Sequence, residues 1–239
     1  SLGGAGAIGV NLSRADVTAI IDNTGAAAGT KVQADAGAVS VSAQDASRIV
    51  TATGALGIST TQGASAAIGA SVSVADMRNN VRAAIAQATV EAQAVQVRAE
   101  ERASIYNVSV GLAGGAGVAV SGSLAVNTIQ NTVHAQIRDA AVTATSGDIR
   151  IVARDMASIA ALAGNVAVSA GGRVAAGMAF AVNQIFDTVY AGAVRSSLSA
   201  AGDIVVQAAF AKPDDLSPGL NAQISTMAVS GAVAAGGSG

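Results

Sequence analysis

The feature that most constrains this chain is an internal repeat of about 55 residues. Segments of alternating apolar and polar residues begin at positions 39, 95, 149 and 204, which are 56, 54 and 55 residues apart. The four segments are Val39–Ala43, Val95–Ala99, Ile149–Ala153 and Ile204–Ala208. Self-similarity at a fixed period indicates stacked units, because one unit alone cannot bury its apolar face.

A second alternating segment accompanies the first in every repeat, and its four copies begin at Val17, Val81, Val133 and Val189. Seven residues before each of them stands another valine, and in three repeats an asparagine follows that valine: Asn11, Asn127 and Asn183. We expect these asparagines to be corner residues whose amides bond the backbone. The pattern predicts one repeat domain over residues 1–239, with approximate repeats 1–57, 58–113, 114–170 and 171–239.

The alternation has a period of two residues, which is typical of β-strands and not of helices. Repeated strands separated by short Gly, Asn and Asp corners predict an all-β parallel β-solenoid, right-handed, in which each repeat supplies two or three coils. The alternative is an antiparallel β-sandwich of long hairpins, because segments such as Ser158–Ser169 are long for one solenoid strand.

Composition favours a thin structure over a thick core. The chain has 58 alanines and 28 glycines, while aromatic residues make up 2% and charged residues 12%. An ordinary domain is about 25% charged and fills its core with large side chains. We expect inward alanine and glycine to let opposing sheets approach closely, with valine and isoleucine in stacked columns. A conventional enzyme fold is therefore not expected.

Charge and cysteine content exclude further classes. With 13 basic and 15 acidic residues the net charge is −2, so the chain lacks the basic surface that nucleic acid requires. It contains no cysteine. The uncharged run Ala103–Ile137 is interrupted by Gly, Ser and Asn, and we expect no membrane-spanning segment. The first residues do not form a signal peptide, and we expect a fragment of a longer chain.

Three acids recur six positions after the start of the first alternating segment: Asp45, Glu101 and Asp155, with Phe210 in the fourth copy. Two or three coils per repeat would separate them by roughly 10 to 15 Å, whereas glycosidase carboxylates lie about 5 to 10 Å apart. Neighbouring Arg48, Arg102 and Arg154 suggest surface ion pairs instead. A carbohydrate-active β-helix is thus the weaker alternative function.

No other motif predicts chemistry. His134 is the single histidine and is expected to be solvated on the outer face, which disfavours zinc binding or nucleophilic catalysis. The glycine clusters at residues 3–9 and 114–119 lack the aspartate of calcium-binding repeats, and they do not open a helix for a dinucleotide. We expect no catalytic residue, no cofactor and no metal.

One segment departs from the repeat. Residues 211–219 contain both prolines and are expected to form an inserted loop, because proline cannot serve inside a strand ladder. As a candidate interaction loop it offers Lys212, Pro213, Asp214, Asp215, Leu216, Ser217 and Pro218. The span 22–35 is expected to be a smaller insertion of the same kind.

The repeat unit resembles the repeat regions of large secreted bacterial exoproteins, the filamentous haemagglutinin-like and leukotoxin-type adhesins. The segments Gly122–Asn127, Val133–Ile137 and Gly147–Asp155 carry the resemblance best, and Ala75 and Phe210 depart from it. The resemblance implies a β-helical shaft that is exported by a two-partner or autotransporter route and that projects an adhesive or toxic tip.

The sequence therefore predicts a structural stalk segment of a secreted or surface-displayed bacterial adhesin, at an extracellular or cell-surface location. The expected partners are flanking repeats of the same polypeptide and a host-cell surface receptor that other regions bind. A further alternative function for this chain is a self-associating or host-binding module. We also expect end-to-end or edge self-association, because the terminal coils lack polar caps.

Overall fold

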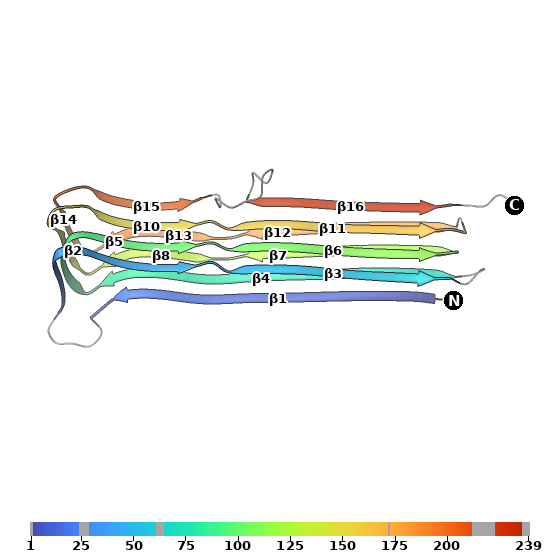
Figure 1. Cartoon of the computed structure of the whole chain (residues 1–239), viewed down its shortest axis with the longest axis horizontal. Helices are drawn as coiled ribbons and strands as arrows, with labels where there is room; N and C mark the ends of the chain where they lie inside the picture. The colour runs from blue at the N-terminus through green and yellow to red at the C-terminus, as the bar shows by residue number, and fades with distance from the viewer. Residues whose placement is uncertain (1, 24–28, 61–64, 172, 212–222, 236–239) are drawn as a thin grey trace.

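The structure is a computed structural model that describes residues 2–23, 29–60, 65–171, 173–211 and 223–235. Over these residues it contains sixteen β-strands and no helix (Figure 1). Every strand pair in the described part of the chain is parallel. The all-β class and the parallel pairing are therefore confirmed, and the alternative of antiparallel hairpins is wrong.

The chain passes through three sheets in the same order four times, and we call one such passage a circuit. Sheet A contains β1 (Leu2–Ile21), β4 (Ala66–Ala86), β7 (Val118–Ile129) with β8 (Thr132–Arg138), and β12 (Val174–Ile185) with β13 (Thr188–Val194). Sheet B contains β2 (Thr30–Asp45), β5 (Ala88–Glu101), β9 (Ala141–Ala144) with β10 (Ile149–Asp155), and β14 (Ser197–Ala200) with β15 (Ile204–Phe210). Sheet C contains β3 (Arg48–Ser59), β6 (Ser104–Gly115), β11 (Ser158–Ser169) and β16 (Ile224–Ala234).

Each sequence repeat forms one circuit, because equivalent residues of successive repeats are direct partners: Val39 pairs with Val95, and Val95 with Ile149. The prediction of two or three coils per repeat is wrong. The cause is strand length, since β4 alone uses 21 residues and β11 uses 12. The predicted insertion over 22–35 is also partly wrong, because β2 already begins at Thr30, with a bulge between Ala34 and Ala38.

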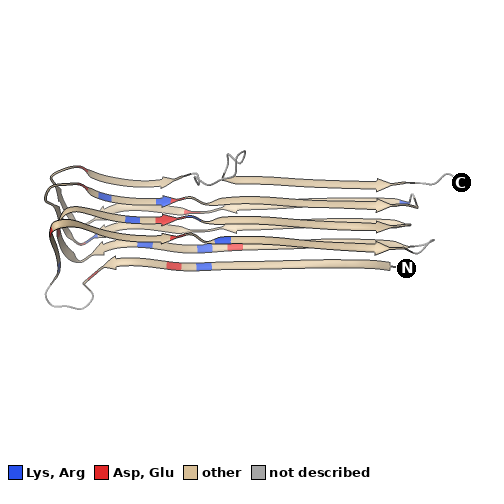
Figure 2. Ribbon diagram, viewed as in Figure 1, with Lys and Arg blue, Asp and Glu red and all other residues tan. Residues whose placement is uncertain are grey.

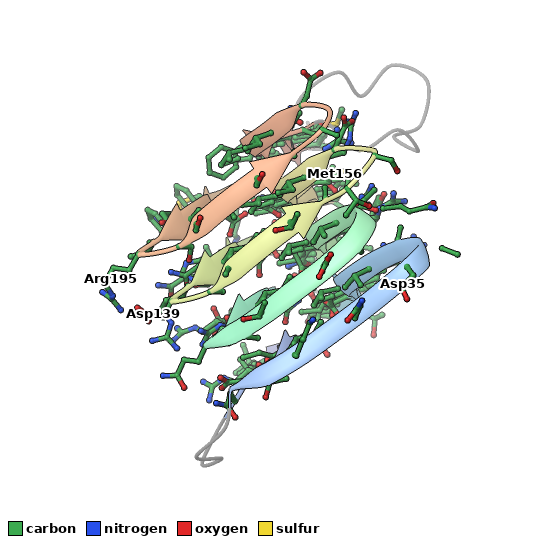
Figure 3. The ribbon with its side chains drawn as sticks, turned by 90° about the vertical axis from the view of Figure 1, so that its left-hand side faces the viewer. Asp35, Asp139, Met156 and Arg195 are labelled. Carbon is green, nitrogen blue, oxygen red and sulfur yellow. The ribbon has the colours of Figure 1, made fainter. Side chains whose placement is uncertain are left out.

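The circuits form two layers whose strands run along the longest axis of the molecule (Figure 1). Sheet A is one layer, and sheets B and C follow one another in the other layer. Between sheets A and B the chain turns through Gln87, Asp139 and Arg195, which have positive φ angles of 50°, 50° and 47°. In the end-on view of Figure 3, Asp139 and Arg195 lie at the same corner of neighbouring circuits, where Arg195 Nε donates to Asp139 Oδ1 at 2.5 Å.

The half of the molecule between sheet B and the second part of sheet A, which we call the wide half, has an aliphatic core. Its inward side chains include Val81, Ile85, Val97, Ile137 and Ile151, all fully buried. Residues of one column sit directly on their equivalents in the next circuit, as Val81 does on Val133. The predicted columns of valine and isoleucine are present here.

The half between sheet C and the first part of sheet A, the narrow half, has small inward residues. Away from the waist its buried apolar cluster consists of alanines, namely Ala67, Ala113, Ala119 and Ala167, whereas next to the waist, the boundary between the two halves, a second cluster buries larger side chains such as Met77, Ile105 and Ile129. A Cβ atom added to Gly69 would overlap the carbonyl oxygen of Leu112 in the opposite layer, and one added to Gly111 would overlap that of Gly122. The two backbones thus meet directly, and the prediction that small residues let the sheets approach closely is confirmed.

Candidate functional site

Both layers are interrupted at the boundary between the two halves, and we call this boundary the waist. In sheet A, pairing between β4 and β7 ends at Met77 with Ile129, and pairing between β4 and β8 resumes at Asn80 with Thr132. In the other layer, β5 ends at Glu101 and β6 begins at Ser104. A break in a strand leaves backbone groups that need other partners when they are buried.

Side chains of a polar column satisfy the break in sheet A. The column contains Asn79, Asn131 and Asp187, each one circuit from the next. The backbone N–H of Ala15 donates to Asn79 Oδ1 at 3.0 Å, and that of Asn79 donates to Asn131 Oδ1 at 3.2 Å. The N–H of Asn131 then donates to Asp187 Oδ1 at 2.6 Å. Each side chain therefore supports the backbone of the preceding circuit.

Facing this column across the waist are the three acids singled out from the sequence, which we call the acid column. Asp45 is the direct partner of Glu101, and Glu101 is the direct partner of Asp155. The expectation that whole coils separate them is wrong, because one repeat is one circuit. Asn79 Nδ2 joins the two columns by donating to Asp45 Oδ2 at 2.9 Å and to Glu101 Oε1 at 3.1 Å.

The interior position changes the acidity of two of these carboxyl groups. Glu101 is 0% exposed and Asp155 is 1% exposed. Burial raises the pKa of Glu101 to about 8, with Asp45 adding to the effect and the Asn79 hydrogen bond opposing it. Burial raises the pKa of Asp155 to about 9, and the neighbouring Asp187 and Glu101 add to it. At neutral pH both groups are therefore held as neutral acids that can donate a hydrogen bond.

The arginines expected to pair with the acid column have other positions. Arg48 lies over the ring of Tyr106, 4.5 Å from its centroid. Arg102 forms an ion pair with Glu100 at 2.7 Å, not with Glu101. The predicted surface ion pairs of the acid column are therefore wrong, since its carboxyl groups point into the molecule while the arginines lie on the outside.

The buried location also decides what the acid column can do. A polysaccharide chain cannot reach carboxyl groups that are 0% and 1% exposed, so their close spacing does not make a glycosidase cleft. Among the residues that the structure describes, no group of three or more His, Asp or Glu side chains is arranged to hold a metal ion. What the column can do is bind and release protons inside the stack.

The predicted corner asparagines lie elsewhere. Asn11, Asn127 and Asn183 are in the middle of sheet A strands and point inward, so the corner prediction is wrong. Asn127 Nδ2 donates to Asn183 Oδ1 at 2.7 Å, and Asn107 Nδ2 donates across the layers to Asn127 Oδ1 at 2.6 Å. Asn11 Nδ2 bonds the hydroxyl of Thr51 at 2.8 Å. These amides join one layer to the other.

His134 lies on the outer side of sheet A, as predicted, with its ring edge-on to that of Tyr190 at 5.6 Å between centroids. Partial burial lowers the pKa of His134, and the positive charge of Arg82 in the adjacent circuit lowers it further. The candidate interaction loop from Lys212 to Pro218 lies outside the described residues.

Sequence reasoning missed the column of Asn79, Asn131 and Asp187. A signal for it exists, because an amide or carboxyl side chain stands two residues before Val81, Val133 and Val189. The first repeat has Ala15 at this place, which hides the regularity.

Comparison with known protein families, with curated proteins and with solved structures found no match to this chain. In the described part of the chain, no helix is long and apolar enough to cross a membrane.

Proposed function

We propose that this chain is a structural segment, a parallel β-solenoid of four coils in which each 55-residue repeat is one coil. In this proposal it forms part of the shaft of a secreted or surface-displayed bacterial adhesin, and flanking repeats of the same polypeptide continue it. The observation that carries the proposal is the register: equivalent residues of successive repeats are direct partners in all three sheets.

The two ends of the stack support the proposal. In the described structure β1, β2 and β3 pair with only one neighbouring strand each, as do β12 to β16 at the other end. At the two ends of sheet A the inward side chains of β1 and β12 are only half-buried, whereas their equivalents in β4 are buried. Further circuits placed on these edges would continue every backbone ladder and every side-chain column without a change in geometry.

The proposal fixes how such a shaft would grow. Neighbouring strands lie about 4.8 Å apart, so four circuits rise about 19 Å along the stack while the strands run perpendicular to it. A long shaft therefore needs many repeats, which fits the resemblance to very large exoproteins. Each circuit would add three parallel backbone ladders, so that bending the shaft would strain all of them together.

Removal of one whole circuit tests the proposal. Val118 and Val174 are direct partners one circuit apart, so deleting residues 118–173 joins Gly117 to an equivalent position. We expect the shortened chain to fold, to keep its β-sheet circular dichroism, and to be thinner by about 4.8 Å in X-ray solution scattering. Deleting residues 118–145 is the matched control, because it removes about half a circuit and destroys the register. Equal loss of folding in both deletions would contradict the proposal.

The proposed location and loop contact need separate tests. Antibodies to the chain should label intact cells of the source bacterium as strongly as permeabilised ones if the shaft is displayed. The charged and proline-containing sequence from Lys212 to Pro218 suits contact with a host or neighbouring protein. Replacing these seven residues by a short Gly-Ser linker should then reduce adhesion of the full-length protein, and unchanged adhesion would remove the loop from the proposal.

A further inference from the structure

Most charged side chains lie in one part of the molecule. Figure 2 shows them gathered over the wide half and the waist. In the narrow half, the described residues 2–13, 49–60, 65–75, 104–129, 158–171, 174–185 and 223–234 contain no Asp, Glu, Lys or Arg, and Arg48 and Asp76 are charged residues at its waist end. At the tip farthest from the waist, Arg173 is a charged residue in the turn after β11. Between the waist and the tip, the outer surfaces of this half are therefore uncharged.

Polarity in the narrow half is the reverse of the usual arrangement. Its inward positions include hydroxyl and amide side chains, such as Ser71, whose hydroxyl lies 2.8 Å from that of Ser109. Its outward positions on sheet A include many apolar side chains: on the end circuits Ile8 is 80%, Val10 60%, Met178 61% and Phe180 57% accessible, and on the middle circuits Val72 and Leu124 are half-buried. A contiguous apolar patch of this kind on a soluble protein marks an interaction site.

The outer surface of sheet A has a regular relief. One column of outward residues, Ile8, Val72, Leu124 and Phe180, forms a ridge along the stack. The adjacent column contains Gly6, Ala70 and Gly122 and forms a furrow beside the ridge over the first three circuits, whereas Met178 fills the same column in the fourth. A Cβ atom added to Gly122 would have no neighbour closer than 3.9 Å, so the furrow is open space.

We propose that this apolar face of sheet A, formed by the ridge, the furrow and the column Val10, Val74, Val126 and Val182, binds the same face of a second copy of the chain. A twofold axis would place the ridge of each copy in the furrow of the other, as in an isologous dimer. The sheets would pack face to face at about 10 Å, with side chains interdigitated as in a sandwich core.

A second copy fits this face for two reasons. Its ridge repeats with the same strand spacing of about 4.8 Å, so ridge and furrow match over three circuits. The three columns carry no charged residue, and in the next outward column, Leu12, Asp76, Thr128 and Gln184, Asp76 is already paired with Arg78. The area is modest: four strands by about 26 Å of apolar strand give roughly 500 Å² per copy, against about 800 Å² in a stable interface. Association of two four-circuit copies is therefore reversible, and the interface becomes larger and more stable when the stack has more circuits.

Sedimentation velocity over a concentration series tests the proposal. Wild-type chain should form a reversible dimer. In the variants Val72→Lys and Leu124→Lys a charge enters the ridge, and the dissociation constant should rise about tenfold or more, equivalent to about 1.4 kcal/mol. Thr132→Lys is the matched control, since it adds the same charge outward on the same sheet in the wide half, and dimerisation should be unchanged. Circular dichroism should confirm that all three variants fold.

Three results would overturn the proposal. The first is a wild-type chain that stays monomeric at every concentration. The second is association that both ridge variants retain, because Val72 and Leu124 lie on middle circuits and end-to-end contacts do not involve them. The third is a monomer that floats with phosphatidylcholine vesicles and loses this binding in Leu124→Lys, which would make the face a lipid-binding surface.

Discussion

The wide and narrow halves share the same backbone ladders but are held together across the layers in different ways. In the wide half, aliphatic side chains such as Ile137 and Ile151 fill the space between sheets A and B. In the narrow half, glycine removes that space, so that sheets A and C touch by their backbones at Gly69 and Gly111. The comparison shows that one repeat can combine a filled core with a nearly empty one.

The two halves should therefore respond in opposite ways to a change in side-chain size. A core that is filled loses stability when atoms are removed, since a cavity remains. A backbone-to-backbone contact loses stability when atoms are added, since neither layer can move aside without breaking its ladders. The waist differs from both, because its contribution to stability depends on whether the buried carboxyl groups of Glu101 and Asp155 are protonated.

The largest effect is expected from one added methyl group in the narrow half. Gly69→Ala places a Cβ atom against the Leu112 carbonyl group on a middle circuit, and this variant should fail to fold or lose most of its stability. Gly122→Ala, in the same sheet, points into open space and should unfold at the wild-type denaturant midpoint or above it. Urea unfolding followed by circular dichroism measures both. Equal midpoints would show that the layers do not touch at Gly69.

Removal of atoms from the wide half should cost less. Ile137→Ala deletes a fully buried side chain and should lower the free energy of unfolding by about 2 to 5 kcal/mol. Ile20→Ala is the control, because Ile20 lies in the same half but is 44% exposed, and its loss should stay within about 0.5 kcal/mol. If the two variants lose the same amount, the aliphatic core is not what holds this half together.

The waist should make stability depend on pH. Glu101 and Asp155 have folded-state pKa values of about 8 and about 9, above the ordinary range near 4 of an unfolded chain. The folded state therefore holds their protons more tightly. Their contribution is fully present below about pH 4 and is lost as pH rises through 8 to 9.

Neutral variants isolate this effect. In Glu101→Gln with Asp155→Asn the fall in unfolding free energy between pH 5 and 9 should largely disappear, since no proton remains to be lost. Exchange of exposed Asp148 for Asn should leave the wild-type slope in place. A double variant whose stability still falls as steeply as that of the wild type would place the titrating groups elsewhere.

The sequence predicted the strands, their parallel pairing and the residue columns, because alternation and a fixed period encode them directly. It did not predict the number of coils per repeat, since alternation marks a strand but not its length: Ser158–Ser169 is a single strand of 12 residues. Nor does alternation say which face is inside. In the narrow half the larger residues Val72 and Leu124 face outward while Ser71 and Ser123 are buried, because only small side chains fit between backbones in contact.

The candidate site was predicted in part. The sequence showed Asp45, Glu101 and Asp155 as a recurring acid. Their position inside the stack depends on the break in the strands at the waist, which no local sequence pattern indicates. Asn79 and Asn131 became meaningful only when the pairing showed a missing backbone hydrogen bond beside each of them.

Spin labelling tests the claim that one repeat is one circuit most directly, and the absence of cysteine from the chain makes it simple. Arg82, His134 and Tyr190 occupy one outward column on successive circuits. Nitroxides at Arg82→Cys with His134→Cys, and at His134→Cys with Tyr190→Cys, should show strong dipolar broadening from a backbone separation of about 4.8 Å. Arg82→Cys with Tyr190→Cys should show weaker broadening at about twice that separation. Absence of broadening in both neighbouring pairs would contradict the account.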